Sequence, residues 1–165
     1  MVLLNKKIRK EKMAAKQEIE RKFLPKFLPV NLRRYHRNSI LQGYLLNSRL
    51  RKKGRRYYLT KKSGHGLVRI EDETQISRKK FEKLWPKTKG KRIRKIRFYI
   101  PYRGHVIELD KYIGNLSTFY LIEVEFKSVF DSKKFTPPKW FGKEVTEDIN
   151  YTNRNLAIYG IPKSS

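Results

Sequence analysis

The stretch at residues 18–23, EIERKF, decides our interpretation of the fold. In an extended strand successive side chains point to opposite faces, so Glu18, Glu20 and Lys22 share one face while Ile19 lies on the other. A half-buried strand normally turns its apolar face toward the core and leaves its charges in water. Because the same alternation recurs along the chain, we take the charged face as the candidate inner face.

Later segments repeat this alternation of charged and apolar side chains. The charged face is expected to comprise Glu18, Glu20, Lys22, Arg49, Arg51, Lys62, Arg69, Glu71, Glu73, Lys95, Arg97, Glu108, Asp110, Glu123 and Glu125. The other face comprises Ile19, Phe23, Leu50, Ile70, Ile96, Phe98, Ile107, Leu109, Ile122, Val124 and Phe126. Unpaired buried charges are costly, so a charged interior requires that acids and bases neighbour each other or hold a metal and an anionic ligand. Eight acids and seven bases meet that requirement.

Short alternating segments bounded by turns predict about eight strands. Besides residues 18–23 they are residues 40–46, 49–51, 56–62, 67–76, 92–100, 105–112 and 119–127. Ser77 is the predicted N-cap of a short helix that ends at Pro86, and further helical turns are expected at residues 131–134 and 154–159. The predicted fold class is mainly β (α+β): an eight-stranded antiparallel closed β-barrel with a few short helices outside, whose apolar outer face is covered by helices and loops. The alternative is a sandwich that buries the apolar face between two sheets and leaves every charge solvated.

The length of 165 residues favours one domain. We expect residues 17–160 to form it, after a basic extension at residues 1–16 that is a candidate contact for nucleic acid or a membrane surface. Met13 is an alternative start of the chain. The formal charge of +26 indicates an anionic partner without identifying it.

The composition also limits the possible cofactors. The chain has no cysteine, which excludes disulfides, zinc fingers, thiolate catalysis and iron–sulfur clusters. Its three histidines are far apart and show no ligand spacing. Any metal would therefore need oxygen ligands, as Mg²⁺, Mn²⁺ or Ca²⁺ prefer. No apolar stretch is long enough to span a membrane, and we expect a cytoplasmic location.

A series of motifs in a fixed order gives the chain a family resemblance. The motifs are ExExK at residues 18–22, QGYL at 42–45, RLR at 49–51, LTKK at 59–62, RIEDE at 69–73, FEKLWP at 81–86, KIR at 95–97, ELD at 108–110, EVEF at 123–126 and WFGKEVTED at 140–148. With them the chain resembles the CYTH superfamily, also called the triphosphate tunnel metalloenzymes, and within it the small bacterial tripolyphosphatases. The resemblance covers residues 18–157.

The resemblance implies an eight-stranded tunnel that binds a triphosphate in its lumen and requires Mg²⁺ or Mn²⁺. It assigns phosphate binding to Lys22, Arg49, Arg51, Lys62, Arg69, Lys95 and Arg97. It assigns metal binding to Glu18, Glu20, Asp110, Glu123 and Glu125. The expected catalytic residues are Lys62, Glu123, Glu125 and Tyr44, although Tyr44 near the tunnel mouth fits barrel packing almost as well. The tunnel acids without an assigned role are Glu71, Glu73 and Glu108.

The predicted reaction is the metal-dependent hydrolysis of inorganic tripolyphosphate to pyrophosphate and orthophosphate. Such chemistry depends mostly on positioning and on neutralising the phosphate oxygens with Arg, Lys and metal, whose bound water is a better nucleophile than bulk water. A tunnel glutamate, or Lys62 if the cationic lumen favours its neutral form, would take the proton. We expect Glu123→Gln or Glu125→Gln to abolish the activity and leave the fold intact.

Other functions remain open at the level of sequence. Within the same fold the candidates are a nucleoside, thiamine or RNA 5′-triphosphatase and a class IV adenylate cyclase, because all of them bind a triphosphate. A different class is a non-enzymatic module that binds RNA or polyphosphate through basic and aromatic side chains. Eight aligned acids would disfavour phosphate binding in such a module unless a metal were present.

The charges are divided unequally between the tunnel set and the rest of the chain. The tunnel set sums to −1 and the remainder to +27. We predict that the basic remainder steers anions or tethers the protein to nucleic acid or polyphosphate. The resemblance implies a homodimer as a candidate assembly, whereas the surface charge opposes self-association unless an anion intervenes.

Overall fold

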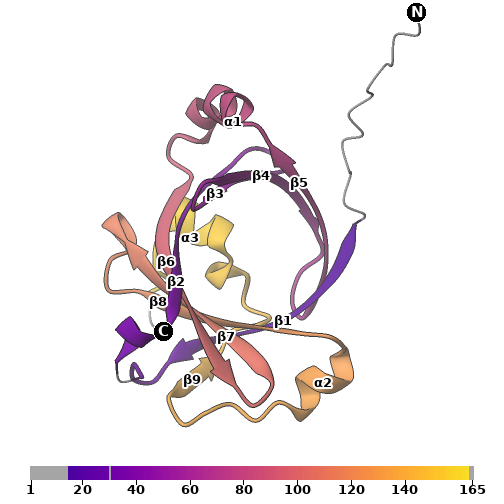
Figure 1. The fold of residues 1–165 in the computed structure, drawn as a ribbon, viewed down its shortest axis with the longest axis vertical. Helices are drawn as coiled ribbons and strands as arrows, with labels where there is room; N and C mark the ends of the chain where they lie inside the picture. The colour runs from indigo at the N-terminus through magenta and orange to yellow at the C-terminus, as the bar shows by residue number, and fades with distance from the viewer. Residues whose placement is uncertain (1–14, 30, 164–165) are drawn as a thin grey trace, which may run out of the picture.

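The computed structural model, which describes residues 15–29 and 31–163, contains a ring of strands (Figure 1). The strands in these residues are β1 (Lys16–Pro25), β2 (His36–Tyr44), β3 (Arg49–Lys53), β4 (Arg56–Ser63), β5 (Val68–Ile76), β6 (Arg92–Tyr102), β7 (His105–Ile113), β8 (Tyr120–Phe126) and β9 (Phe141–Glu144). The helices are α1 (Arg78–Leu84), α2 (Val129–Lys134) and α3 (Asn153–Tyr159). Short 3-10 turns lie at Leu32–Arg34, Trp85–Thr88, Gly114–Leu116 and Ile149–Tyr151.

The sheet is antiparallel and closes on itself. Its order is β5-β4-β3-β2-β6-β7-β8-β1, and β1 also pairs with β5. At this closure Glu18 lies opposite Arg69 of β5, and Lys22 lies opposite Glu123 of β8. The predicted eight-stranded antiparallel barrel is confirmed, and the sandwich is excluded because the sheet has no opposing second layer.

The ninth strand was not predicted from the sequence. β9 pairs with the end of β1 outside the ring, and the outward-facing Arg21 of β1 binds its Glu144 through two hydrogen bonds of 2.8 and 2.7 Å. A Cβ on Gly142 would lie 2.9 Å from the carbonyl oxygen of Leu24, so this glycine allows the close approach of β9. Four residues with a central glycine carry too little alternation to predict a strand.

The ends of two predicted elements also differ from expectation. β2 begins at His36, four residues before the predicted start, because pairing with β6 already begins at the His36–Tyr99 pair. β1 begins at Lys16, the last residue of the predicted basic extension. Residues 1–14 of that extension, including Met13, lie outside the described residues.

Helix α1 begins as the sequence predicts. The side-chain oxygen of Ser77 accepts a hydrogen bond of 3.1 Å from the backbone N–H of Lys80. The ring of Phe81 then packs between those of Tyr57 and Trp85, with centroid separations of 5.0 and 5.1 Å. These contacts fix α1 over the outer face of β4.

Two apolar clusters lie on either side of the barrel wall. The larger is formed by outward-facing side chains of β1, β6, β7 and β8, covered by Phe135 after α2 and Phe141 of β9. The smaller lies inside one end of the barrel, where Leu156 of α3 packs with Ile93 and Leu121, and Figure 1 shows α3 across that far end. The predicted cover of helices and loops does not extend to Ile70 of β5, which is 52% exposed in the described part of the chain.

Within the described ranges, no helix is long and apolar enough to cross a membrane.

Candidate active site

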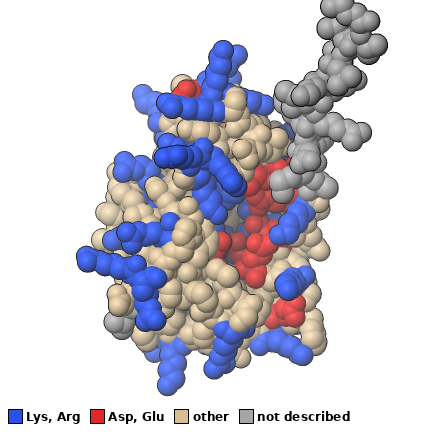
Figure 2. All heavy atoms as spheres, in the orientation of Figure 1, with Lys and Arg blue, Asp and Glu red and all other residues tan. Residues whose placement is uncertain are grey.

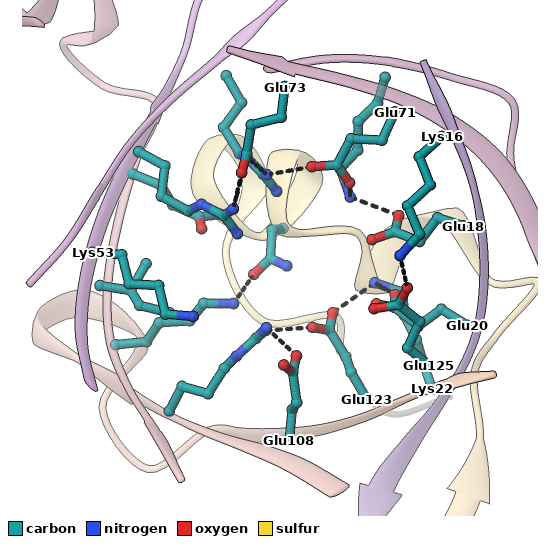
Figure 3. Close-up of a pocket in the computed structure, with 18 residues that line it drawn as sticks. Lys16, Glu18, Glu20, Lys22, Lys53, Glu71, Glu73, Glu108, Glu123 and Glu125 are labelled. Atoms are coloured by element: carbon teal, nitrogen blue, oxygen red, sulfur yellow. Dashed lines mark hydrogen bonds and ion pairs between the residues drawn. The ribbon is translucent and has the colours of Figure 1, made fainter. Parts of the chain in front are cut away.

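The barrel encloses a cavity of about 290 Å³ toward which the labelled side chains of Figure 3 point. Its charged lining residues are Lys16, Glu18, Glu20, Lys22, Arg49, Arg51, Lys53, Lys62, Glu71, Glu73, Lys95, Arg97, Glu108, Glu123 and Glu125. Of the side chains predicted to face the lumen, all but Arg69 and Asp110 line this cavity. The alternation in the sequence therefore identified cavity-lining residues on strands that lie far apart along the chain.

The acids and bases occupy different parts of the barrel wall. All eight predicted tunnel acids belong to β7, β8, β1 and β5, which are neighbours in the ring. We call these four strands the acidic half. The other four, β6, β2, β3 and β4, contain no Asp or Glu, and we call them the basic half. Of these, β6, β3 and β4 contribute Lys and Arg to the cavity, whereas β2 contributes Ile40 and Gln42. Figure 2 shows the mouth of the cavity with acidic side chains gathered on one side and basic ones facing them.

Arg97 of β6 connects the two halves at their β6–β7 border. Its guanidinium donates two hydrogen bonds of 2.7 Å to the carboxylate of Asp110 and also contacts Glu108 and Glu123. Lys95 donates a hydrogen bond of 2.5 Å to the same Asp110. Asp110 is fully buried behind the cavity lining, so these bonds hold the two bases in place.

Burial and charge shift the pKa values of this cluster in different directions. Burial alone would raise the pKa of Glu123, but Lys22 and Arg97 hold it well below its usual range. Burial raises the pKa of Glu108, and the nearby charges of Glu123 and Asp110 raise it further against the opposing effect of Arg97. Burial also lowers the pKa of Lys95 despite its contact with Asp110. The cluster thus contains one acid and one base whose pKa values move toward neutrality.

Lys22 lies between two carboxylates of the acidic half. Its Nζ is 2.7 Å from an oxygen of Glu123 and 3.1 Å from one of Glu20. Burial lowers the pKa of Lys22, but these two carboxylates outweigh burial and raise it. Lys22 therefore stays an ammonium ion, suited to binding an anion rather than to accepting a proton.

The bases of β3 combine carboxylate contacts with free hydrogen-bond donors. Arg49 contacts Glu71 at 3.2 Å and Glu73 at 3.4 Å, and Arg51 contacts Glu73 at 2.7 Å. Among the residues that the structure describes, the Nε atoms of Arg49 and Arg51 are buried and have no hydrogen-bond partner. A buried donor without a partner is costly, and a phosphate oxygen in the cavity would satisfy it.

The acidic half supplies only oxygen ligands, which fits a hard divalent cation. Glu20 and Glu125 lie directly opposite each other on β1 and β8, and Glu18 shares their face of β1. Each of the three contacts a base, however: Glu18 contacts Lys62, Glu20 contacts Arg69, and Glu125 contacts Lys16. Within the described part of the chain, no three acids or histidines converge closely enough to hold a metal. A cation would have to displace these bases.

Tyr44 lies outside this cavity, although the sequence placed it near the tunnel mouth. It is buried at the end of β2, and its hydroxyl accepts a hydrogen bond of 2.7 Å from the side-chain amide of Gln42. Burial raises the pKa of Tyr44 to about 12. The phenol therefore remains protonated at neutral pH.

Five residues that line the cavity were not in the predicted inner face: Ile40 and Gln42 of β2, and Lys16, Lys53 and Asn153. Lys16 precedes Glu18 by two positions and Lys53 follows Arg51 by two, so extending the alternation of each strand would have found both. Asn153 had no such signal because it comes from α3. Its side-chain oxygen accepts hydrogen bonds from Lys95, at 3.3 Å, and from the hydroxyl of Tyr112, at 2.6 Å.

A closed barrel whose lumen is divided into an acidic and a basic half defines this chain as a charged tunnel protein. The comparisons with known proteins name its relatives. No protein-family model matches the chain. The chain is 45% identical over 149 residues to an inorganic triphosphatase of Nitrosomonas europaea, covering 86% of this chain and 97% of that protein. It is 30% identical over 125 residues to an inorganic triphosphatase of Acetivibrio thermocellus, covering 70% and 77%.

Solved structures agree with these relatives. The crystal structure of an inorganic triphosphatase matches with a TM-score of 0.66 and 40% identity, covering 88% of this chain and 97% of that one. A Bacillus halodurans structure matches with a TM-score of 0.50 and 18% identity over 93% of this chain and 96% of that one, which supports the fold alone. The chain belongs to the CYTH superfamily and, within it, to the inorganic triphosphatases, as its motifs predicted. These are phosphoanhydride hydrolases, and membership indicates a divalent metal cofactor without naming the metal.

Proposed function

We propose that this chain hydrolyses inorganic tripolyphosphate to pyrophosphate and orthophosphate in the barrel lumen, with Mg²⁺ or Mn²⁺ as cofactor. The observation that carries the proposal is the division of the lumen into an acidic and a basic half, with two unpartnered arginine Nε atoms on the basic half. A triphosphate chain is a polyanion that needs both many donors and a counter-cation. In this lumen the basic half supplies hydrogen-bond donors for the phosphates, and the acidic half supplies oxygen ligands for a cation.

The cavity-lining residues fall into two groups by charge, and among them Lys22 is the one phosphate-binding candidate that lies in the acidic half. Lys22, Arg49, Arg51, Lys62, Lys95 and Arg97 line the cavity as phosphate-binding groups. Glu18, Glu20, Glu123 and Glu125 line it as candidate metal ligands. A bound divalent cation would neutralise phosphate oxygens and activate a water molecule. Asp110, which is fully buried, fits the role of positioning Lys95 and Arg97 better than that of a ligand.

Glu108 is the proton acceptor that the electrostatics favour. It lines the cavity, and its pKa is raised by burial and by neighbouring carboxylates, which makes it a stronger base than an ordinary glutamate. Lys62 is a weaker candidate because its Nζ is already engaged by two carboxylates, at 2.9 Å from oxygens of both Glu18 and Glu71. Lys95, with its lowered pKa, is the second candidate.

A substrate panel tests the proposed reaction. Phosphate release is measured from tripolyphosphate, ATP, thiamine triphosphate and triphosphorylated RNA, each with Mg²⁺, Mn²⁺ or EDTA. We expect metal-dependent release with the highest kcat/KM for tripolyphosphate. Higher kcat/KM on another triphosphate would reassign the substrate, and no release from any of them would contradict the enzymatic function.

The pH dependence of kcat tests the proton acceptor. In Glu108→Gln the acid limb of the profile should disappear and kcat should fall about 100-fold, the usual scale for a lost general base. Lys95→Arg serves as the matched comparison. If Glu108→Gln keeps the wild-type profile while Lys95→Arg loses it, the proton acceptor is Lys95.

The basic surface supports a second proposal about partners. The charge outside the tunnel set is +27 and would attract nucleic acid or polyphosphate in the cytosol, where we expect the protein to act. Binding of unstructured RNA and of long polyphosphate should weaken steeply between about 50 and 200 mM salt. Negligible binding at the lower salt would contradict this proposal. Analytical ultracentrifugation of the same samples would decide between a monomer and the proposed homodimer.

A further inference from the structure

A second cavity, of about 550 Å³, adjoins the first at the end of the barrel where α3 lies. Lys22, Arg49, Lys62 and Asn153 line both cavities. These shared side chains separate two neighbouring chambers. An anion held in the first chamber by the shared bases would also be close to the second.

The two cavities differ in charge. Seven glutamates line the first, whereas neither Asp nor Glu is among the described residues that line the second. The second cavity instead has five Lys and Arg residues, together with His65 and several hydroxyl and amide side chains. Such a lining attracts an anion and gives a metal ion no carboxylate ligand.

Arg154 distinguishes the second cavity from the ion-pair network of the first. Its guanidinium donates hydrogen bonds of 2.5 and 2.7 Å to the carbonyl oxygens of Leu45 and Leu46, and it lies 5.4 Å from the ring centroid of Tyr44. Within the described chain, Arg154 has no acidic side chain in ion-pair range, unlike Lys22 and Lys62. Its charge is thus held in place by backbone and is not already neutralised by an acid.

We propose that the second cavity is a metal-free binding site for a phosphate group. That group is either orthophosphate released by hydrolysis or the far end of a polyphosphate longer than three units. The proposal rests on the proposed function for the choice of phosphate as the anion. A phosphate chain that passes the shared bases from the first cavity meets Arg69 and Arg154, and no carboxylate is among the described residues of that lining.

Ser48 offers the sharpest test because it lines the second cavity and not the first. Ser48→Glu places a carboxylate among the five bases, and Ser48→Gln is the neutral control of nearly the same size. Orthophosphate binding is measured by calorimetry on the metal-free protein in EDTA. We expect Ser48→Gln to bind like the wild type and Ser48→Glu to bind at least tenfold more weakly, since charges about 4 Å apart near a protein surface interact by several times the thermal energy.

Tetrapolyphosphate distinguishes the two sources of the phosphate group. If the site holds the end of a longer chain, Ser48→Glu should raise KM for tetrapolyphosphate at least tenfold relative to KM for tripolyphosphate. If it holds released product, the variant should lose orthophosphate binding and leave that ratio unchanged. Ser48→Glu and Ser48→Gln with equal orthophosphate binding and equal KM ratios would overturn the proposal.

Arg154 provides an independent variant pair. Arg154→Lys keeps the charge and Arg154→Gln removes it, while both change the hydrogen bonds to the loop before β3. Loss of phosphate binding in Arg154→Gln alone supports the site, and equal loss in both assigns Arg154 a structural role and counts against it. Failure of the proposed function can be told apart from failure of this site. If the wild type hydrolyses no tripolyphosphate, the proposed function fails, but weaker orthophosphate binding by Ser48→Glu than by the wild type would still support the site.

Discussion

The acidic and basic halves of the barrel differ in how they depend on each other. The acidic half contains its own bases, Lys16, Lys22 and Arg69, so many of its carboxylates are paired within that half. The basic half has no acid, and its bases pair mainly with carboxylates of β5 and β7, the two strands of the acidic half that border it. A lumen built this way is stable without ligand, yet every base of the basic half keeps its attraction for a stronger anion. The same ion pairs thus stabilise the free protein and hold its bases in positions where a polyanion can bind.

The largest expected effect is on activity, from the acidic half. Glu125→Gln should lower phosphate release about 100-fold or more, the scale of losing one preorganised electrostatic contact. Its melting temperature should hardly change, because Glu125 is 48% exposed and its contact Lys16 is 72% exposed. Full turnover in Glu125→Gln would remove this residue from the site.

For Glu123→Gln the structure changes the expectation for stability, since the sequence alone predicted that the fold would stay intact. Glu123 is buried against Lys22 and Arg97, so the substitution leaves two buried bases short of a partner. We now expect loss of stability as well as loss of activity. Thermal unfolding measured beside Glu125→Gln would separate the two effects.

The next largest effect is on stability, at the border of the halves. Arg97→Met leaves Asp110, Glu108 and Glu123 without their shared base, and the free energy of unfolding should fall by about 3–5 kcal/mol. Arg51→Met is the matched control within the basic half, because its partner Glu73 keeps contacts with Arg49 and Thr60. Urea unfolding should show a clearly smaller loss for the control. Equal losses would mean that the border has no special role.

The third effect is a loss of stability in acid, which should come from the acidic half. Burial would raise the pKa values of Glu71 and Glu73, but Lys62 lowers the first and Arg51 the second to below 4.5. The folded protein then binds fewer protons than the unfolded chain, so this stabilisation is present above pH 4.5 and is lost as the pH falls through the folded-state pKa values. Melting temperatures between pH 7 and pH 3 should decline below pH 4.5, less steeply in a Glu71→Gln, Glu73→Gln double variant. A decline that is equally steep in the variant would assign it to other groups.

The smallest effect on stability should come from Glu108→Gln. The folded-state pKa of Glu108 is raised above 4.5, so its charged form costs stability at neutral pH. Glu108→Gln should therefore change the free energy of unfolding at pH 7 by no more than about 0.5 kcal/mol, or increase it. A loss comparable to that of Arg97→Met would show that the Glu108 contact with Arg97 stabilises the fold.

Much of the barrel and its lumen could be predicted because strand alternation assigns each residue to a face. The pairing of charges could not, since which base meets Glu123 depends on the registers of β8 with β1 and β7 and of β7 with β6. Asn153 and the second cavity were also beyond reach, because the place of α3 at the barrel depends on tertiary contacts such as the packing of Leu156. Ile70 followed the strand pattern correctly, but the pattern does not say which outer surfaces a helix will cover.

β1, the first strand of the described residues, closes the barrel by pairing with both β8 and β5. β1 pairs with β5, β8 and β9, so its last partners are synthesised more than 90 residues after it. Pairings of such long range form slowly, which leaves β1 without most of its neighbours while the rest of the ring assembles. A waiting strand with alternate charged side chains, Lys16, Glu18, Glu20 and Lys22, resists pairing with other unfinished chains. The charges that line the cavity of the folded protein would thus protect the newly made chain from aggregation.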